Sequence, residues 1–378
     1  MPTVLYTAST FSHIVSFHLP YLQRFQELGW RVEAACGGEL REIPGADAQI
    51  VLPLAKKMTA PENFQAAAQL HGILAGYDLV ITHTSLAAFF TRLAAKGMKR
   101  RPKIINVVHG YLFDDQTAAA KRLILTQAER ITAPQTDLLL TMNDWDTQWA
   151  MTHRVAGRTA KIPGMGVALD TLRVPEGTRQ AMREKLGLAQ EDVALIYPAE
   201  FSGRKNQAML LRAMPLLPQE VKLILPGRGA LLAQCRAMAH ELGVDGRVIF
   251  PEFVDNIPQW LAAADIAVSA SRSEGLPFNV MEAMAAGLPA VVTDVKGHSD
   301  LVAPEENGYL FPYDDAAAFA AAVEPLTASP QLRQRMGAAG KEKMRPYALD
   351  AVLPQVMEQY LSVMDGGYER LYGKINDF

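Results

Sequence analysis

Short β-rich runs alternate with helix-like stretches along this chain, and the alternation occurs twice. The first set of runs covers 4–7, 32–35, 79–82, 104–108 and 138–141, separated by helix-like stretches at 17–28, 61–75, 85–96, 117–130 and 143–152. The second set covers 193–197, 221–225, 247–250, 266–269 and 290–293, separated by helices at about 205–214, 230–242, 257–263 and 278–286. Strands spaced by helices form parallel sheets with helices on both faces, so the pattern predicts an α/β chain with two such sheets.

A stretch rich in Gly and Pro, residues 162–178, lies between the two sets and is typical of a linker. We therefore expect two Rossmann-like domains facing a cleft, over residues 1–165 and 166–350. The tail predicts helices at 330–345 and 349–364, after an alanine-rich helix at 316–323. The last segment, 351–378, is expected to cross back to the N-terminal domain.

Composition excludes several classes of protein. The chain has 378 residues and only two cysteines, Cys36 and Cys235, which excludes a disulfide scaffold and favours a reducing compartment. No apolar run reaches the roughly 18 residues of a membrane span, and no basic region precedes the first apolar stretch, so we expect neither a span nor a signal peptide. A net charge of −3 argues against nucleic-acid binding, and we expect a cytoplasmic protein.

The strongest motif is SRSEGLPFNVMEAMAAGLPAVVTD, residues 271–294, which follows the run DIAVSAS. Gly275 permits close approach of the backbone to a ligand, and Pro277 suits the first position of a helix. The N–H groups near 276–279 would attract an anion such as a diphosphate. Glu274 and Glu282 flank this site, and a carboxylate is better used as an acceptor for hydroxyl groups than as a partner for phosphate.

Together with the doubled sheet pattern, this segment resembles the donor-binding signature of the retaining glycosyltransferases of family 4, which have the two-domain GT-B fold. The resemblance is strongest over 160–312. It implies that Glu274 contacts the donor sugar beside the reaction centre and that Glu282 holds the ribose hydroxyls. It also implies that a short stretch of backbone meets the diphosphate and sugar; this stretch comprises Gly275, Leu276, Pro277, Phe278 and Asn279.

Other loops of the second domain fit the same resemblance. In YPAEFSGRKNQ (197–207), Lys205 and Arg204 are placed to neutralise a leaving diphosphate, and such charge stabilisation is often the main source of catalysis. Glu200 stands where the family usually has an Arg, and Arg204 is the residue that could supply that second charge. Phe253 and Val254 are the candidates for contact with the nucleotide base. The loop LPGRGALL (225–232) resembles the family's glycine loop, although a lone G-x-G is a weak signal.

In the first domain, His109 in NVVHGYLFD (106–114) matches the family's His-Gly, which implies contact with the donor sugar or its leaving group. His13 and His18, in a loop expected over 9–21, and His83, at the end of a run, are candidates for the acceptor side. The four histidines share no ligand spacing along the sequence. The resemblance implies metal-independent catalysis without a cofactor, so we expect no metal site.

The resemblance further implies front-face transfer, in which the leaving diphosphate helps to take the acceptor proton. It suggests a hexosyl- or N-acetylhexosaminyltransferase that uses a nucleotide-sugar, with uridine favoured as the base. The acceptor would be a glycan on a polyprenyl diphosphate, in bacterial polysaccharide biosynthesis. A basic cluster of Lys96, Lys99, Arg100, Arg101 and Lys103 fits a solvated loop, or peripheral contact with the inner face of the cell membrane.

Two other functions remain open on the sequence alone. A non-hydrolysing sugar-nucleotide epimerase shares the two-domain architecture and needs no acceptor. A non-catalytic module that binds sugar-nucleotides would keep its role without Lys205 or His109.

Overall fold

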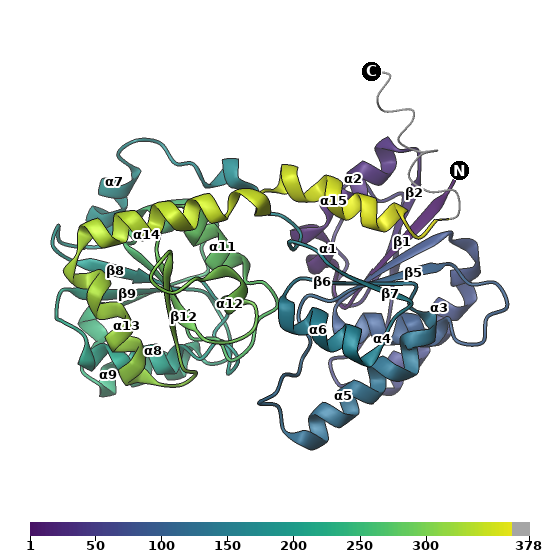
Figure 1. Cartoon of the computed structure of the whole chain (residues 1–378), viewed down its shortest axis with the longest axis horizontal. Coiled ribbons are helices and arrows are strands. Elements are labelled where there is room, and N and C mark those ends of the chain that lie inside the picture. Colours follow the sequence, from purple (N-terminus) through teal and green to yellow (C-terminus); the bar gives the residue numbers. More distant parts are fainter. Residues whose placement is uncertain (365–378) are drawn as a thin grey trace. The chain divides into compact units, whose positions relative to one another are not determined.

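The computed structural model describes residues 1–364 and divides into two compact units (Figure 1). The first unit comprises Met1–Gly166 together with the chain from Asp350 onward, and the second comprises Val167–Leu349. The predicted α/β class with two parallel sheets is confirmed. The predicted last segment, 351–378, extends beyond the described residues.

The first unit contains a seven-stranded parallel sheet in the order β3-β2-β1-β4-β5-β6-β7. Its strands are β1 (Thr3–Ala8), β2 (Arg31–Cys36), β3 (Ala48–Val51), β4 (Leu79–His83), β5 (Lys103–Val107), β6 (Leu138–Thr141) and β7 (Arg158–Lys161). Its helices are α1 (Phe11–Phe17), α2 (Leu19–Glu27), α3 (Pro61–Ile73), α4 (Ser85–Ala94), α5 (Ala119–Thr132), α6 (Asp144–His153) and α15 (Leu349–Leu361), the last of which starts one residue before the unit boundary.

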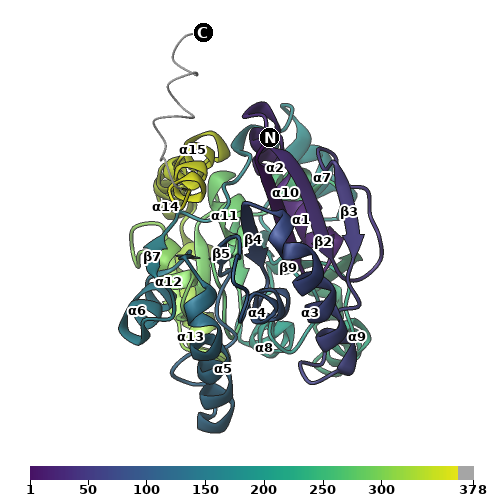
Figure 2. The same ribbon diagram turned by 90° about the vertical axis from the view of Figure 1, so that its right-hand side faces the viewer.

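Alternate residues of β1 pack on opposite faces of this sheet. Leu5 belongs to the apolar core formed with α3 and α4, where Phe90 is also buried. Tyr6 points to the other face and packs edge-on against Phe25 of α2, which in turn stacks on Tyr360 of α15. The final described helix therefore covers the same face as α2, opposite α3 and α4 (Figures 1 and 2).

The second unit contains a six-stranded parallel sheet in the order β10-β9-β8-β11-β12-β13. Its strands are β8 (Val193–Ile196), β9 (Val221–Pro226), β10 (Val248–Glu252), β11 (Ile266–Ser269), β12 (Ala290–Thr293) and β13 (Gly308–Phe311). Its helices are α7 (Thr178–Lys185), α8 (Gln207–Ala213), α9 (Leu232–Glu241), α10 (Ile257–Ala263), α11 (Phe278–Ala285), α12 (His298–Leu301), α13 (Ala316–Ala328) and α14 (Pro330–Lys343). In Figure 1, α8, α9 and α13 lie on one side of the sheet, and α11 and α14 lie on the other.

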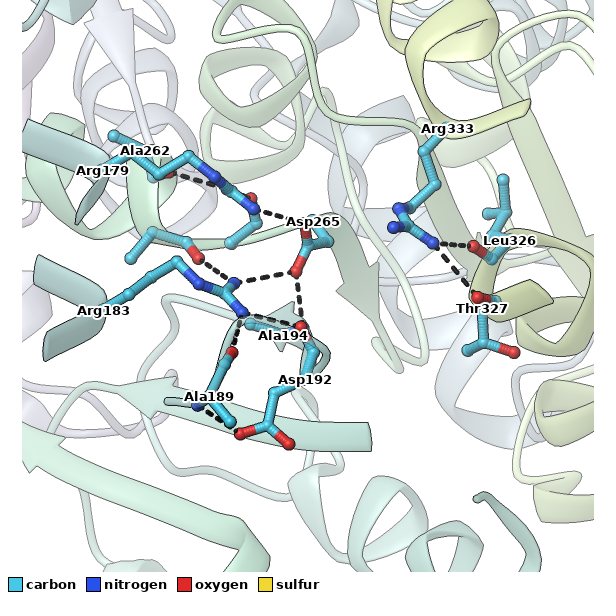
Figure 3. Close-up of polar contacts among 12 residues, drawn as sticks. Arg179, Arg183, Ala189, Asp192, Ala194, Ala262, Asp265, Leu326, Thr327 and Arg333 are labelled. Carbon is cyan, nitrogen blue, oxygen red and sulfur yellow. Dashed lines mark hydrogen bonds and ion pairs between the residues drawn. The ribbon is translucent and has the colours of Figure 1, made fainter. Parts of the chain in front are cut away.

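An ionic network in which Asp265 and Arg183 are buried and Arg179 is half exposed fixes α7 to the start of β11 (Figure 3). The Asp265 carboxylate accepts hydrogen bonds from Arg179 at 2.6 Å, from Arg183 at 3.1 Å and from the backbone N–H of Ala194 at 2.8 Å. Arg183 also donates to the carbonyls of Ala189 and Asp192, each at 2.7 Å. Because the guanidinium and carboxylate groups are well partnered, this network tolerates burial.

Two details differ from the sequence predictions. The loop expected over 9–21 contains helix α1, because the Thr10 hydroxyl caps it by accepting from the His13 N–H and because Phe11 and Ile14 face the core one turn apart. Strands β3, β7 and β13 were not predicted. They are short strands with few fully buried positions, so they lack a continuous apolar run. Within residues 1–364, the helices are too short or too polar to cross a membrane.

Candidate functional site

In each sheet, the chain first adds strands toward one edge and then returns to add the remaining strands toward the other edge. The candidate residues lie near the point of this change. In the first unit this point lies between β1 and β4, and in the second between β8 and β11. Ligands of open α/β sheets bind outside the carboxyl ends of the strands at such points. Lys205 and Glu274 follow β8 and β11, whereas His13 and His83 follow or end β1 and β4.

In the second unit, Glu274 forms ion pairs with both cations that the sequence singled out. Lys205 Nζ lies 2.6 Å from Glu274 Oε1, and Arg204 Nη1 lies 3.0 Å from Oε2. Lys205 and Glu274 are mostly buried, whereas half of the Arg204 side chain is exposed. Both carboxylate oxygens are therefore engaged, and the three side chains together carry one net positive charge.

Burial and neighbouring charge act in opposite directions on these groups. Burial alone would raise the pKa of Glu274, but Lys205, Arg204 and His298 lower it to about 2. Burial lowers the pKa of Lys205, and the Glu274 carboxylate opposes that effect. The arrangement thus keeps Glu274 ionised and makes Lys205 depend on it for its charge.

His298, the first residue of α12, is a neighbour of this site that the sequence analysis did not select. Its ring is fully buried, and its Nδ1 lies 2.9 Å from the carbonyl oxygen and 3.0 Å from the hydroxyl of Thr293. Burial lowers its pKa to about 4, against the opposing effect of Glu274. Its position directly after a predicted strand, in a segment containing Gly-His, was the signal available in the sequence.

A cavity of about 460 Å³ opens in the second unit beside this cluster. Five of the predicted donor-binding residues line it: Phe253, Val254, Phe278, Asn279 and Glu282. Glu200 and Arg228 line it as well, so the residue at the family's Arg position faces the same space as a cation from the glycine loop. Phe253 is 63% exposed, which leaves its ring available for stacking. The volume lies within the range of small-ligand pockets.

Glu282 differs electrostatically from Glu274. Burial raises the pKa of the Glu282 carboxyl to about 7, and no cation acts to lower it. A carboxyl group with that pKa is poised between its neutral and ionised forms at neutral pH, and its ionised form accepts hydrogen bonds from hydroxyl groups.

In the glycine loop after β9, the backbone packs so closely against neighbouring backbone that two positions leave no room for a Cβ atom. A Cβ on Gly227 would lie 1.9 Å from the Ala199 carbonyl oxygen, and one on Gly229 would lie 2.3 Å from that of Phe201. Both glycines also have φ near +150°, which other residues avoid. The loops after β8 and β9 therefore interlock along one wall of the cavity.

Contacts with two other loops, those after β8 and β12, hold the motif around α11 in place. Pro277 precedes the helix as its N-cap rather than taking its first position, and the helix begins at Phe278, as the predicted range 278–286 has it. Asn279 donates from its side-chain amide to the Pro198 carbonyl at 3.0 Å. A Cβ on Gly297 would lie 2.6 Å from the Gly275 carbonyl oxygen, so the loop after β12 packs directly on the Glu274–Leu276 backbone. Leu276 itself is buried.

In the first unit, the fold brings together the four histidines that lie far apart in the sequence. His13, His18, His83 and His109 each offer a ring nitrogen within 4.8 Å of the others. His18 and His83 are fully buried and stack with centroids 3.8 Å apart, whereas His13 and His109 are partly exposed. Burial lowers the pKa of His13 to about 4, and burial with neighbouring imidazoles lowers the pKa of the other three further.

The basic cluster 96–103 divides into different environments. Arg101 forms a bidentate ion pair with Asp137, with contacts of 2.5 and 3.1 Å, and this carboxylate also accepts from the Ile104 N–H. Lys103 begins strand β5. Lys96, Lys99 and Arg100 lie in the connection after α4, and all three are exposed. Arg101 therefore anchors the sheet rather than extending into solvent.

Two family models match most of the chain. Residues 178–343 match the model described as glycosyl transferases group 1, and residues 19–163 match a glycosyl transferase 4-like domain. The EpsD protein of Bacillus subtilis (strain 168), named as a glycosyltransferase, is 33% identical over 370 residues, which are 96% of this chain and 97% of its own.

More distant relatives agree with that assignment. A UDP-Gal:α-D-GlcNAc-diphosphoundecaprenol α-1,3-galactosyltransferase of Escherichia coli is 26% identical over 261 residues, 66% of each chain. The structure of Anabaena Alr3699/HepE in complex with UDP and glucose matches with a TM-score of 0.78 at 17% identity, covering 95% of this chain and 99% of that chain. WaaG, a glycosyltransferase involved in lipopolysaccharide biosynthesis, matches with a TM-score of 0.74 at 17% identity, covering 96% and 100%.

Proposed function

Because the chain belongs to the GT-B glycosyltransferases of the family 4 type, we propose that it transfers a sugar, with retention of configuration, from a UDP-sugar to a lipid-linked glycan. The observation that carries the proposal is that the segments after β8 and β11 supply residues both to the 460 Å³ cavity and to the Glu274–Lys205–Arg204 cluster of the second unit. The two features provide a place for a nucleoside and a place for charge that develops on a leaving diphosphate.

The cavity suits the nucleoside part of the donor. Phe253 offers an exposed ring against which the base can stack, and ionised Glu282 offers oxygens for the two ribose hydroxyls. Arg228 lies on the same wall and supplies a cation close to the first phosphate. Two comparisons support uridine as the base. The name of the Escherichia coli relative gives UDP-Gal as its donor, and HepE forms a complex with UDP.

The charged cluster suits the reacting end of the donor. Both oxygens of Glu274 are held by cations, so it is positioned to accept a hydrogen bond from the donor sugar rather than to attack it. In the transfer, the bond between the anomeric carbon and the diphosphate oxygen breaks while the acceptor oxygen bonds to the same face of that carbon. The acceptor proton passes to the departing diphosphate, and Lys205 and Arg204 stabilise its charge.

The acceptor is proposed to be a glycan on a polyprenyl diphosphate. The support is the diphosphoundecaprenol acceptor for which the Escherichia coli relative is named. Peripheral contact with an anionic membrane would involve the exposed Lys96, Lys99 and Arg100. Helix α5 adds apolar side chains to the surface of the same unit, since Leu123 is 59% and Ile124 is 69% exposed.

A turnover assay distinguishes this function from its rivals. The full chain is incubated with UDP-glucose, UDP-galactose, UDP-GlcNAc and UDP-GalNAc, with and without undecaprenyl-diphosphate-linked GlcNAc in detergent, and UDP release is followed. A transferase releases UDP with one donor only when an acceptor is present, and the proton spectrum of the product shows an α linkage from an α donor. Lys205→Ala should abolish that release.

The two alternatives give different results in the same assay. An epimerase would convert UDP-GlcNAc to its epimer without an acceptor. A binding module would show donor-dependent stabilisation with no turnover in any combination. An inverted linkage in the product would contradict the retaining mechanism while leaving the transferase assignment intact.

A further inference from the structure

The four histidines of the first unit converge on a common point, although their sequence spacing predicts no metal site. His13 and His18 follow β1, His83 ends β4, and His109 follows β5, so all four project from the carboxyl edge of the sheet. The parallel arrangement of these three strands brings their loops to the same edge. Within residues 1–364, this is the one cluster of His, Cys, Asp or Glu side chains whose ligand atoms lie this close together.

Two of the distances between ring nitrogens are close to those of a coordination sphere, and the ligand atoms of all four rings lie within 4.8 Å of one another. His13 Nε2 lies 3.4 Å and His83 Nδ1 lies 3.1 Å from the same atom, His109 Nε2. A tetrahedral ion with metal–nitrogen bonds of about 2.0–2.1 Å holds neighbouring ligand nitrogens about 3.3 Å apart. If His109 Nε2 carries no proton, both neighbouring rings would have to donate to its single lone pair, whereas a shared cation would be bound by one lone pair from each ring.

Several ring nitrogens at this place have no hydrogen-bond partner in the part of the chain that the structure describes. Both nitrogens of His18 and the Nε2 of His83 are shielded from solvent and unpartnered. Leaving buried polar atoms unpaired costs free energy, and a metal ion bound by one nitrogen of His18 would remove part of that cost.

We propose that His13, His18, His83 and His109 bind one divalent transition-metal ion. Imidazole nitrogens without carboxylate or thiolate partners select the class that contains Zn²⁺, Co²⁺, Ni²⁺ and Cu²⁺, and disfavour Mg²⁺ and Ca²⁺. The charged cluster proposed to meet the diphosphate lies in the other unit, and among the four ligands only His109 is also predicted to contact the donor. The ion would tie the loops after β1, β4 and β5 together at the edge where the acceptor is predicted.

Equilibrium dialysis of the untagged full chain against Zn²⁺ tests the proposal, with bound metal measured by mass spectrometry. A parallel titration with Co²⁺ reads the geometry, since tetrahedral Co²⁺ absorbs strongly in the visible region. The expected result is one ion per chain, an intense Co²⁺ spectrum, and a rise in Tm on adding Zn²⁺ that EDTA reverses.

Variants separate this site from chance binding. The His13 side chain is partly exposed, so the His13→Ala variant should fold. It should bind Zn²⁺ at least tenfold more weakly than the wild type. His83→Gln serves as a second ligand variant. His240→Ala removes an exposed histidine of the second unit and should bind as the wild type does. The proposal is overturned if the wild type takes up no Zn²⁺ or Co²⁺, or if His13→Ala and His83→Gln bind both ions as the wild type does. In either case the rings would form only a stacked neutral cluster.

Discussion

Lys205 Nζ lies 2.6 Å from Glu274 Oε1, and these two residues, 69 positions apart, follow the adjacent strands β8 and β11. The pair is mostly buried, and Arg204 contacts the second carboxylate oxygen from the solvent side. This places a fixed carboxylate and two cations at the point of the second sheet where ligands bind.

Breaking this pair should affect stability and activity together. Lys205→Met leaves the buried carboxylate with only Arg204, so unfolding free energy should fall by about 3 kcal/mol, as for other buried pairs that lose one partner. Transfer should fall at least about 100-fold, since a cation that meets the leaving group is lost. Denaturant unfolding and UDP release measure the two effects.

Arg204→Ala is the matched comparison. Its side chain is half exposed, so stability should change by less than about 1 kcal/mol while transfer still falls. Equal stability losses in the two variants would contradict the burial argument.

The pH dependence of donor affinity should follow Glu282. Its pKa of about 7 is above the usual value, so ionised carboxylate increases as pH rises from 6 to 8. Affinity for a UDP-sugar should rise over this range by up to about tenfold, because only the carboxylate accepts both ribose hydroxyls well. Calorimetric titration with UDP-glucose is suitable, since its diphosphate does not titrate in this range.

The stability of the unliganded protein should change in the opposite direction. A carboxyl group whose folded pKa exceeds its unfolded pKa binds protons more tightly in the folded state, so its contribution falls as pH rises from about 5 to above 7. Glu282→Gln should flatten both profiles. A wild-type rise in affinity that persists in this variant would assign the effect to another group.

Nucleotide affinity should depend on the exposed ring of Phe253. Phe253→Ala should weaken UDP binding about tenfold, the usual effect of removing one stacking partner of a base. Because the side chain is 63% exposed, Tm should not change. Phe64→Ala, which removes an aromatic side chain that is 55% exposed in the first unit, should leave UDP affinity unchanged.

Replacing Gly227 should destabilise the second unit. A Cβ there would lie 1.9 Å from the Ala199 carbonyl oxygen, and φ is +150°, so Gly227→Ala should cost about 2–4 kcal/mol and weaken UDP binding. Gly246→Ala meets open space and should change stability by less than about 0.5 kcal/mol. Similar unfolding midpoints for the two variants would show that the loop relaxes around the new methyl group.

The sequence predicts the buried strands better than the edges of the sheets. Strand β11 appears as a run of four buried residues, Ile266–Ser269, which the alternation with helices identifies. Strand β7 has no fully buried position, because it is the edge of its sheet and its residues Arg158–Lys161 read as a polar loop. Helix α1 was missed because it is only seven residues long, too short for its apolar residues to show a helical period.

The site was predicted residue by residue but not as contacts. Glu274 and Lys205 were selected for separate roles, and their ion pair depends on the pairing of β8 with β11, which only the topology supplies. The convergence of His13, His83 and His109 has the same cause, since three loops separated by tens of residues meet at one edge of a sheet. Local spacing carries no information about such clusters.

The decisive measurement for the donor site is binding of UDP-glucose, UDP-galactose, UDP-GlcNAc and UDP-GalNAc to the wild type, Glu282→Ala and Lys205→Ala. We expect one donor to raise the wild-type Tm, since a ligand at 100 times its Kd adds about 2.7 kcal/mol, and both variants to lose this shift. An unchanged shift in both variants, with the variants folded, would contradict the placement of the donor in the second unit.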